Sequence, residues 1–425
     1  MTFALHTFGC KVNIYESEYI INLLKESDYE MLDFNSDKEA DIYIINTCTV
    51  TNEADKKDRK LIHTTRKNHS NSILIVMGCY SQLNPNDIDA DIVLGNKYKS
   101  NIITLIETFK KHKEKIVMVN DITKTNFEDM YINRFITHTR AFVKIQDGCN
   151  AFCAYCAIPY ARGGIRSKDF DKVIDEVTNL VNNGYKEIVL TGIHTGRYGI
   201  EKHTNLETLL KELVKIKGIF RIRLSSIEIN EITDGIIDLI KNNKIMARHL
   251  HIPLQSGSND ILKSMNRLYN KEYFIDRVNY IRNEIDDISI TTDLIVGFPG
   301  ETDDNFKETI DTLNKIKFTK IHTFPYSKRN GTKAASMKNQ IDGNIKKCRV
   351  KEVLLLSDKY EKEFYKSKIG NTYDGIIETR KDNKKIVITS NYIPVEVKTD
   401  LKNNTKVNIK INELKRDNVF GKIIS

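Results

Sequence analysis

Three cysteines lie close together in the middle of the sequence, where Cys149, Cys153 and Cys156 form a CxxxCxxC pattern. They follow an apolar stretch that predicts a strand, so one tight loop carries all three thiols. Three thiolates can hold three irons of a [4Fe–4S] cluster and leave the fourth iron without a protein ligand. The alternative is a structural zinc site, which prefers four protein ligands. The sequence has no fourth cysteine nearby, and the nearest downstream histidine is His194, so the pattern favours the cluster.

Strand-like and helix-like stretches alternate around this loop, from Ala141 to about Ser327. Six βα repeats over this length predict a parallel barrel or partial barrel, whose active site lies at the carboxyl ends of its strands. The cysteine loop follows the first strand and is therefore expected at that face. A helical pattern follows over 344–367, and we expect one domain to span residues 135–367. The predicted strands are 142–146, 187–191, 221–225, 249–254, 289–296 and 320–326.

The first 113 residues show a separate strand–helix alternation, which is typical of a doubly wound α/β domain. Residues 113–138 are expected to form a connector between this domain and the barrel. The predicted strands of the first domain are 3–8, 41–46, 73–77 and 92–94, and its predicted helices are 15–26, 53–67 and 102–111.

Three further cysteines, Cys10, Cys48 and Cys79, each come at the end of a predicted strand in this first domain. Because the carboxyl ends of parallel strands lie along one edge of a sheet, these distant residues are expected to converge. Three converging thiolates again suit a [4Fe–4S] cluster with one open iron. The alternative is three buried, inert thiols. Cys348 lies in a basic helical stretch without a Cys or His partner and is expected to be an ordinary helix residue.

The tail, residues 368–425, has a different character, because Ile, Val and Thr alternate there with polar residues. This pattern predicts a small all-β domain. The tail holds 12 Lys/Arg and 7 Asp/Glu, a net charge of +5 out of +9 for the whole chain of 425 residues. A basic β-barrel suits an RNA backbone. The alternative is a solvated basic surface without a partner.

The start of the chain shows no basic segment followed by a long apolar one, and the longest apolar runs are too short to cross a bilayer. We therefore expect a cytoplasmic protein without membrane association. In a reducing compartment the seven cysteines are expected to be ligands or packed thiols rather than disulfides.

The cysteine loop and the strand that follows it resemble the radical-SAM superfamily, whose members use S-adenosylmethionine (SAM) and a [4Fe–4S] cluster for radical chemistry. In this resemblance Tyr155, beside the last cysteine, packs near the adenine of SAM. The segment Leu190-Thr191-Gly192-Ile193-His194-Thr195-Gly196 is similar to the glycine-containing segment that receives the SAM amino group. Polar residues also end the third and fourth strands, although helix capping is the alternative for each single turn. The residues predicted to bind SAM are Tyr155, Thr191, Gly192, Ser226 and Gln255.

With two open clusters on two domains, the chain resembles the methylthiotransferase family over nearly its whole length. One cluster generates the radical in that family and the other holds sulfur, and the tail resembles its small RNA-binding β-barrel (TRAM-like). The strings that carry the resemblance are Gly9-Cys10-Lys11-Val12-Asn13, Asn46-Thr47-Cys48-Thr49-Val50-Thr51, Ile145-Gln146-Asp147-Gly148-Cys149-Asn150 and Cys156-Ala157-Ile158-Pro159-Tyr160-Ala161-Arg162-Gly163.

These strings look like the branch that modifies threonylcarbamoyladenosine on the 3′ side of the tRNA anticodon. The isopentenyladenosine branch usually carries Gln-Met where this chain has Lys11-Val12, and Arg-Glu where it has Thr51-Asn52. A threonylcarbamoyl group carries a carboxylate, which needs cationic or hydrogen-bonding partners when buried. The candidates for these tRNA contacts are Lys11, Arg162 and Arg166.

The expected function is therefore a tRNA methylthiotransferase that produces the 2-methylthio derivative of threonylcarbamoyladenosine. The resemblance implies two [4Fe–4S] clusters, SAM, a tRNA anticodon stem–loop as substrate, an electron donor such as flavodoxin or ferredoxin, and a sulfur donor. Two alternatives stay open: the isopentenyladenosine enzyme, and a non-catalytic RNA-binding module with structural zinc.

Overall fold

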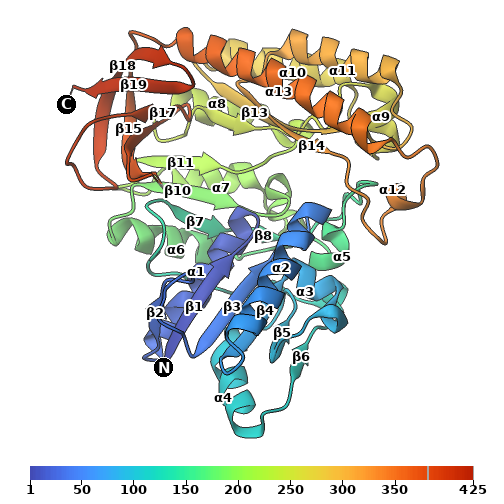
Figure 1. Ribbon diagram of the computed structural model, residues 1–425. Helices are drawn as coiled ribbons and strands as arrows, with labels where there is room; N and C mark the ends of the chain where they lie inside the picture. Colours follow the sequence, from blue (N-terminus) through green and yellow to red (C-terminus); the bar gives the residue numbers. More distant parts are fainter. Residues whose placement is uncertain (381, 425) are drawn as a thin grey trace.

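The computed structural model describes residues 1–380 and 382–424. It begins with a parallel sheet of six strands in the order β2-β1-β3-β4-β5-β6 (Figure 1). Strands β3 and β4 are buried along their whole length, because α1 and α4 pack on one face of the sheet and α2 packs on the other. The strands are β1 (Thr2–Thr7), β2 (Glu30–Leu32), β3 (Ile42–Thr47), β4 (Ile73–Gly78), β5 (Ile92–Leu94) and β6 (Ile116–Met118); the helices are α1 (Lys11–Glu26), α2 (Asn52–Asn68), α3 (Cys79–Leu83) and α4 (Ile102–His112).

The two edge strands of this sheet, β2 and β6, were not predicted from the sequence. Each has only three residues and neither is fully buried, so neither shows the long apolar run that marks the central strands. Strand β6 lies in the stretch expected to be a connector, and the first sheet therefore extends to Met118.

Two three-stranded parallel sheets follow, in the orders β11-β10-β7 and β12-β13-β14. Isolated parallel bridges between Ile222 and Met246 and between Ser226 and His251 connect them, so the six strands form the predicted partial barrel around one large core. The strands are β7 (Ala141–Lys144), β10 (Glu187–Thr191), β11 (Arg221–Leu224), β12 (His249–His251), β13 (Ser289–Val296) and β14 (Lys320–Pro325), with a small antiparallel pair of β8 (Gln146–Asp147) and β9 (Arg166–Ser167).

Helices surround this partial barrel on the outside and bury their apolar faces against it. They are α6 (Phe170–Asn182), α7 (Leu206–Leu213), α8 (Asp234–Asn242), α9 (Asn259–Ser264), α10 (Lys271–Glu284) and α11 (Asp303–Ile316). The short helix α5 (Ile158–Arg162) lies against α3, and α12 (Lys333–Ser336) packs Ala334 into a smaller apolar cluster with Phe298 and Tyr326. Short 3₁₀ helices occupy Pro85–Asp87, Lys99–Asn101, Ile122–Lys124, Thr195–Arg197, Ile200–Lys202 and Ile229–Glu231.

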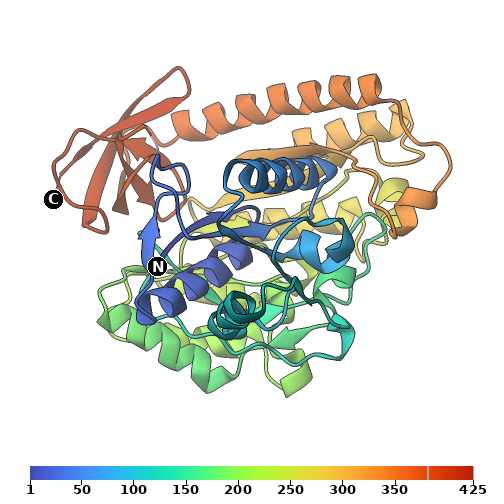
Figure 2. The same cartoon turned by 60° about the horizontal axis from the view of Figure 1, so that its bottom comes forward.

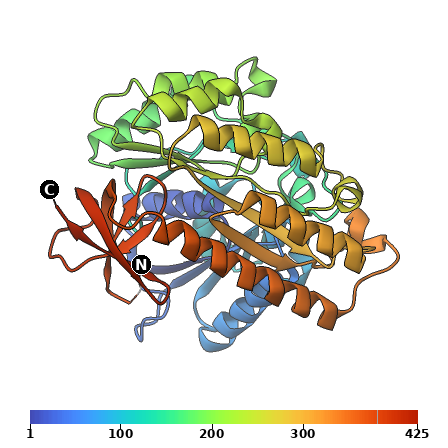
Figure 3. The same cartoon turned by 90° about the horizontal axis from the view of Figure 1, so that it is seen from above.

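A long helix, α13 (Gly343–Lys366), runs along the outside of the barrel and leads into a closed five-stranded β-barrel (Figure 3). The small barrel has its own apolar core and confirms the all-β prediction for the tail. Its strands, in the order β15-β16-β17-β19-β18, are β15 (Thr372–Thr379), β16 (Lys385–Thr389), β17 (Pro394–Glu396), β19 (Asn418–Ile423) and β18 (Lys406–Lys415).

The first sheet and the small β-barrel both pack against the large barrel (Figure 2). Helix α1 lies against β7, and α3 lies against α5, which follows the cysteine loop. The large barrel contacts the small β-barrel through Arg221 and Arg223, whose guanidinium groups are buried. They donate hydrogen bonds to backbone carbonyls of the small barrel, at 3.1 Å to Ile388 and 3.3 Å to Thr389.

Among the described residues, the helices are all too short or too polar to cross a bilayer.

Candidate functional site

The CxxxCxxC motif lies on the loop after β8, at the carboxyl end of the first barrel strand. Backbone hydrogen bonds fix the loop, from Cys149 N to Gly163 O at 2.9 Å and from Cys156 N to Cys153 O at 2.9 Å. Burial, together with the Cys153 and Cys149 thiols, raises the pKa of Cys156 to about 12. The three thiols are therefore close enough to repel one another as thiolates. Bound iron supplies the positive charge that such a set requires.

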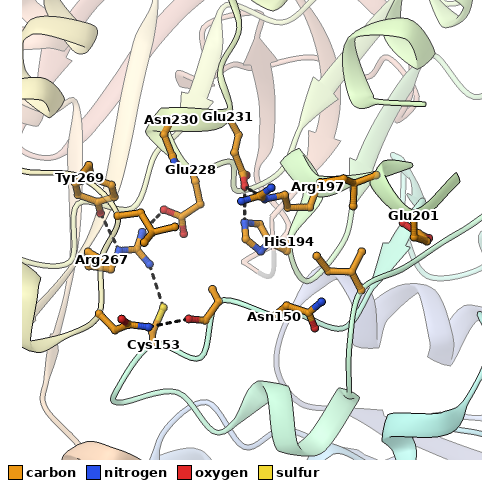
Figure 4. A pocket seen from close by; sticks show the side chains of 15 residues that line it. Asn150, Cys153, His194, Arg197, Glu201, Glu228, Asn230, Glu231, Arg267 and Tyr269 are labelled. Atoms are coloured by element: carbon orange, nitrogen blue, oxygen red, sulfur yellow. Dashed lines mark hydrogen bonds and ion pairs between the residues drawn. The ribbon is translucent and has the colours of Figure 1, made fainter. Parts of the chain in front are cut away.

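Two cationic side chains contact the sulfurs of this loop, and Figure 4 shows the contact between Arg267 and Cys153. His194 Nδ1 lies 3.2 Å from Cys149 Sγ, and Arg267 donates a hydrogen bond to Cys153 Sγ at 3.4 Å. Burial lowers the pKa of His194, but the Cys149 thiol and the Glu231 carboxylate raise it, and the result is about 10. His194 is therefore a cation at neutral pH. Positive charge from the loop after β10 and from the turn after α9 stabilises a thiolate cluster.

A cavity of about 460 Å³ opens beside this loop, within the range of small-molecule sites. It combines acidic, basic and aromatic groups, among which Arg267 pairs with Glu228 and donates to the Tyr269 hydroxyl at 3.1 Å. Neither Arg267 nor Glu231 was singled out from the sequence, since each follows a strand by many residues and matches no short metal-binding motif. The lining residues include Asn150, Cys153, His194, Arg197, Glu201, Glu228, Asn230, Glu231, Arg267 and Tyr269 (Figure 4).

The residues predicted to bind SAM lie on the expected edge of the barrel. Thr191 is the last residue of β10. Gly192 comes next and lies so close to Gln146 that a Cβ added at Gly192 would be 3.0 Å from Gln146 Oε1. Gln255 follows β12 with a φ of 66°. None of the five lines the 460 Å³ cavity within the part of the chain that the structure describes, so their SAM contacts stay predictions.

The other three cysteines stand at three neighbouring strand ends of the first sheet. Cys10 immediately precedes α1, Cys48 follows β3, and Cys79 begins α3 directly after β4. Burial and the nearby Cys79 and Cys10 thiols raise the pKa of Cys48. A Cβ added at Gly9 would lie 2.7 Å from Cys48 Sγ, so the backbone before Cys10 approaches Cys48 closely. The predicted convergence of these cysteines therefore occurs.

Arg162, the last residue of α5, joins the barrel to this second set of cysteines. Its Nε donates to Cys79 Sγ at 3.2 Å, and its Nη2 donates to Asn13 Oδ1 at 2.8 Å. Its Nη1 donates to Glu16 at 2.7 Å and to Asp147 at 3.2 Å. One fully buried side chain therefore contacts a predicted cluster ligand, the helix after Cys10 and strand β8, which precedes Cys149.

Positive charge exceeds negative charge around this arginine. Lys144 and Lys99 lie 3.0 Å and 3.3 Å from Glu16, and Lys144 lies 3.3 Å from Asp147. Three buried cations, including Arg162, thus surround two buried carboxylates. Buried charges are costly unless paired. The surplus positive charge fits an anionic group at Cys79, as a cluster held by thiolates provides.

The three residues predicted to contact tRNA lie in different environments. Arg162 is fully buried, which places it inside the protein rather than on a surface that faces RNA. Arg166 is also used internally, because its guanidinium donates to the backbone carbonyl of Arg162 at 2.6 Å and to Thr125 Oγ1 at 2.9 Å. Lys11, the first residue of α1, is partly buried and lies beside Cys10.

The donor sets fit clusters better than single metal ions. Within residues 1–380 and 382–424, no three His, Cys, Asp or Glu side chains lie close enough together to bind one ion. Zinc would hold its sulfur ligands within about 4 Å of one another, since each bond is about 2.3 Å long. In a four-iron cluster each thiolate binds a different iron, so the sulfurs lie farther apart.

Protein families match both of the units that carry the cysteine sets, the large barrel and the first sheet. The radical SAM superfamily matches residues 143–313, and the uncharacterized protein family UPF0004 matches residues 2–97. The chain is 45% identical to the threonylcarbamoyladenosine tRNA methylthiotransferase MtaB of Bacillus subtilis, over 93% of this chain and 90% of that protein. It is 34% identical to the tRNA-2-methylthio-N(6)-dimethylallyladenosine synthase of Acetivibrio thermocellus, over 99% of this chain and 91% of that protein.

Among solved structures, the radical SAM methyltransferase TsrM from Kitasatospora setae, with cobalamin and a [4Fe–4S] cluster bound, is similar in fold. The TM-score is 0.57 at 13% sequence identity, over 79% of this chain and 77% of that one. The two cysteine sets, the barrel and the sequence similarity lead to one conclusion: the chain belongs to the radical-SAM methylthiotransferase family, in its MtaB-type branch.

Proposed function

We propose that this protein converts threonylcarbamoyladenosine, next to the tRNA anticodon, to its 2-methylthio derivative. As a radical-SAM methylthiotransferase it is an enzyme that uses SAM and [4Fe–4S] clusters. The observation that carries the proposal is the pair of cysteine sets on two different units, linked through Arg162. The 45% identity to a protein named for this substrate supports the branch.

The proposed division of labour follows the three units of the fold. The first sheet, which holds Cys10, Cys48 and Cys79, would bind the auxiliary cluster. Residues 135–367 would form the radical-SAM core, with its cluster on Cys149, Cys153 and Cys156 and with SAM near Tyr155, Thr191, Gly192, Ser226 and Gln255. When bound, the clusters and SAM supply the radical and the methylthio group.

The chain's own residues hold and orient these groups. His194 and Arg267 place positive charge against Cys149 and Cys153, and Arg162 does the same at Cys79. The target base must leave its stack to reach the barrel, which is easier in a single-stranded anticodon loop than in a duplex. We place the activity in the cytoplasm and expect it to need an electron donor, such as flavodoxin or ferredoxin, and a sulfur donor.

The nucleoside content of tRNA tests the proposal directly. In a strain that lacks this protein, the 2-methylthio mark on threonylcarbamoyladenosine should disappear while the mark on isopentenyladenosine remains. The measurement is mass spectrometry of digested tRNA, with a strain re-expressing the gene as the control. The opposite pattern would assign the protein to the isopentenyladenosine branch, and an unchanged profile would contradict the enzyme activity itself.

The small β-barrel is proposed to bind the tRNA backbone. Lys410 on β18 and Lys422 on β19 stand directly opposite each other and are both exposed. Like charges in this position destabilise a sheet by themselves, and a phosphate between them relieves the repulsion. The plot of log Kobs against log salt concentration has a negative slope. Changing both lysines to glutamine should make this slope less negative by about 1.5. Filter binding or fluorescence anisotropy with tRNA over a salt series measures this slope.

The matched control is the double variant Lys25→Gln/Lys111→Gln. Both residues are exposed lysines on the helices of the first sheet, and α4, which carries Lys111, lies at the opposite end of the molecule from the small barrel (Figure 1). This variant removes the same charge and should keep the wild-type slope. Equal slopes for all three proteins would mean that the small barrel carries only a solvated basic surface.

A further inference from the structure

A cluster of cationic and aromatic side chains lies where the first sheet, the large barrel and the small β-barrel meet. Tyr392, in the loop before β17, is at its centre and is 36% exposed. The guanidinium carbon of Arg223 lies 4.6 Å from the centre of the Tyr392 ring, and that of Arg140 lies 5.7 Å away. Burial lowers the pKa of Lys11, Tyr392 raises it, and the positive charges of Arg140 and Arg223 lower it further, so Lys11 lies near these three side chains. Three separate units of the chain therefore build this cluster.

Lys11 is the cation of this cluster that has no carboxylate partner. Each neighbouring arginine has at least one, and the pairs are Arg140 with Glu378 at 2.7 Å, Arg223 with Glu187 at 2.7 Å, and Arg221 with Asp374 at 2.8 Å. Within residues 1–380 and 382–424, no acidic side chain lies within ion-pair distance of Lys11. The three arginines and the three carboxylates balance, so the cluster has one surplus positive charge.

His249, on β12, adds an unpaired polar atom to the same cluster. Its ring lies 4.6 Å from the Tyr392 ring, centre to centre, and only 6% of the residue is exposed. Its Nε2 lies 3.2 Å from Thr291 Oγ1, whereas its Nδ1 has no hydrogen-bond partner among the described residues. A buried polar atom without a partner is costly, and a ligand that donates or accepts a hydrogen bond there removes the cost.

The position of Lys11 relates this cluster to the chemistry. Lys11 follows Cys10, a proposed ligand of the auxiliary cluster, by one residue. Ring nitrogen N1 of adenine lies between carbon 2 and carbon 6, and carbon 6 carries the N6 nitrogen. A base presented to sulfur through carbon 2 therefore carries its N6 substituent close by. In threonylcarbamoyladenosine this substituent ends in a carboxylate and a hydroxyl. One surplus positive charge and one free hydrogen-bonding nitrogen match these two groups.

We propose that Lys11, Tyr392 and His249 form the subsite for the threonylcarbamoyl substituent, with Lys11 paired to its carboxylate and His249 Nδ1 hydrogen-bonded to its hydroxyl. The subsite rests on the proposed function and deepens it, because it names the residues that select a carboxylate-bearing base. Tyr392 comes from the small β-barrel, so the subsite is complete only when that barrel is docked on the large one.

The test combines a change in the protein with a change in the substrate. Two anticodon stem–loop RNAs are compared, one with threonylcarbamoyladenosine and one with its carboxylate as the neutral methyl ester. KM and kcat for methylthio transfer are measured with the wild-type holoenzyme, Lys11→Gln and Lys11→Arg. Lys25→Gln, at the other end of α1, is the matched control. The iron content of each variant is determined, so that loss of a cluster is recognised.

The wild-type protein should show a KM about tenfold or more higher for the ester than for the acid, because a hydrogen-bonded charge pair is lost. Lys11→Gln should show the same high KM for both RNAs, whereas Lys11→Arg and Lys25→Gln should still prefer the acid. If Lys11→Gln weakens both RNAs equally and preserves the preference for the acid, Lys11 binds a phosphate and the subsite proposal is wrong. If wild-type protein binds acid and ester equally, the subsite is refuted without any variant.

The two proposals fail in different ways. Wild-type protein that leaves the acid RNA unmodified would overturn the proposed function, and the subsite with it. Wild-type protein that modifies both RNAs with equal KM would uphold the methylthio transfer and overturn only the subsite.

Discussion

Replacing Cys149, Cys153 and Cys156 with alanine should abolish reductive cleavage of SAM and halve the iron content. Wild-type protein reconstituted without oxygen should hold about eight irons in two four-iron clusters, and the variant about four. The reason is that these thiols alone supply sulfur ligands at the carboxyl end of the barrel's first strand. Iron and sulfide determination, together with the formation of 5′-deoxyadenosine, measures both effects.

The reciprocal variant separates the two cysteine sets. Replacing Cys10, Cys48 and Cys79 with alanine should also leave about four irons, but SAM cleavage should persist while methylthio transfer is lost. The matched control is Cys348→Ala, which removes an exposed thiol on α13 and should keep about eight irons. Protein that takes up stoichiometric zinc and no iron would contradict the assignment of both sites.

Replacing Arg162 with methionine should lower the free energy of unfolding by about 3–5 kcal/mol, because it removes one partner from a buried charge network. Methionine fills much of the volume but leaves Glu16, Asp147 and Asn13 each without a donor that they have in the wild-type protein. The interface between the first sheet and the barrel should therefore open at lower denaturant concentration. Urea unfolding followed by circular dichroism and by limited proteolysis measures the change.

A second variant at Arg162 shows whether the forked geometry of its side chain matters as well as its charge, and a variant at Arg134 is the control. Arg162→Lys keeps the charge but cannot donate to four groups at once, so its loss of stability should be smaller than that of Arg162→Met but clearly measurable. Arg134→Met removes an exposed arginine and should change the free energy of unfolding by less than about 0.5 kcal/mol. Equal stability of Arg162→Met and wild-type protein would show that the network contributes nothing to the docking of the two units.

The order of strands and helices was largely predictable, because it depends on local patterns. Central strands such as 42–47 and 73–78 begin with continuous apolar runs, over 42–45 and 73–77, and these runs are buried on both faces. The edge strands β2 and β6 escaped prediction because three partly exposed residues leave no periodic signal. For the same reason the end of the first unit was placed at residue 113, before its last strand.

The cysteine sets were predictable for a physical reason that operates at the level of the sheet. A parallel sheet aligns its carboxyl ends, so residues that end different strands meet even when they are far apart in sequence. Cys10, Cys48 and Cys79 satisfy this condition, and their convergence could be inferred from strand positions alone. The cations around the sulfurs do not follow such a rule. Arg267 reaches Cys153 from a turn after α9, and nothing in its local sequence marks it.

By itself, the sequence determined the fold class, the two sets of cysteines and the resemblance to a family, since each depends on residue type and spacing within one element or one sheet. The tertiary structure alone decided what the charged residues do. Arg162 was expected to face RNA and is instead buried against Cys79, while Lys11, Tyr392 and His249 come together from three units. The pattern along an element shows which of its faces is buried, but not which distant element covers that face. Long-range charge pairing therefore becomes visible only once the units have docked.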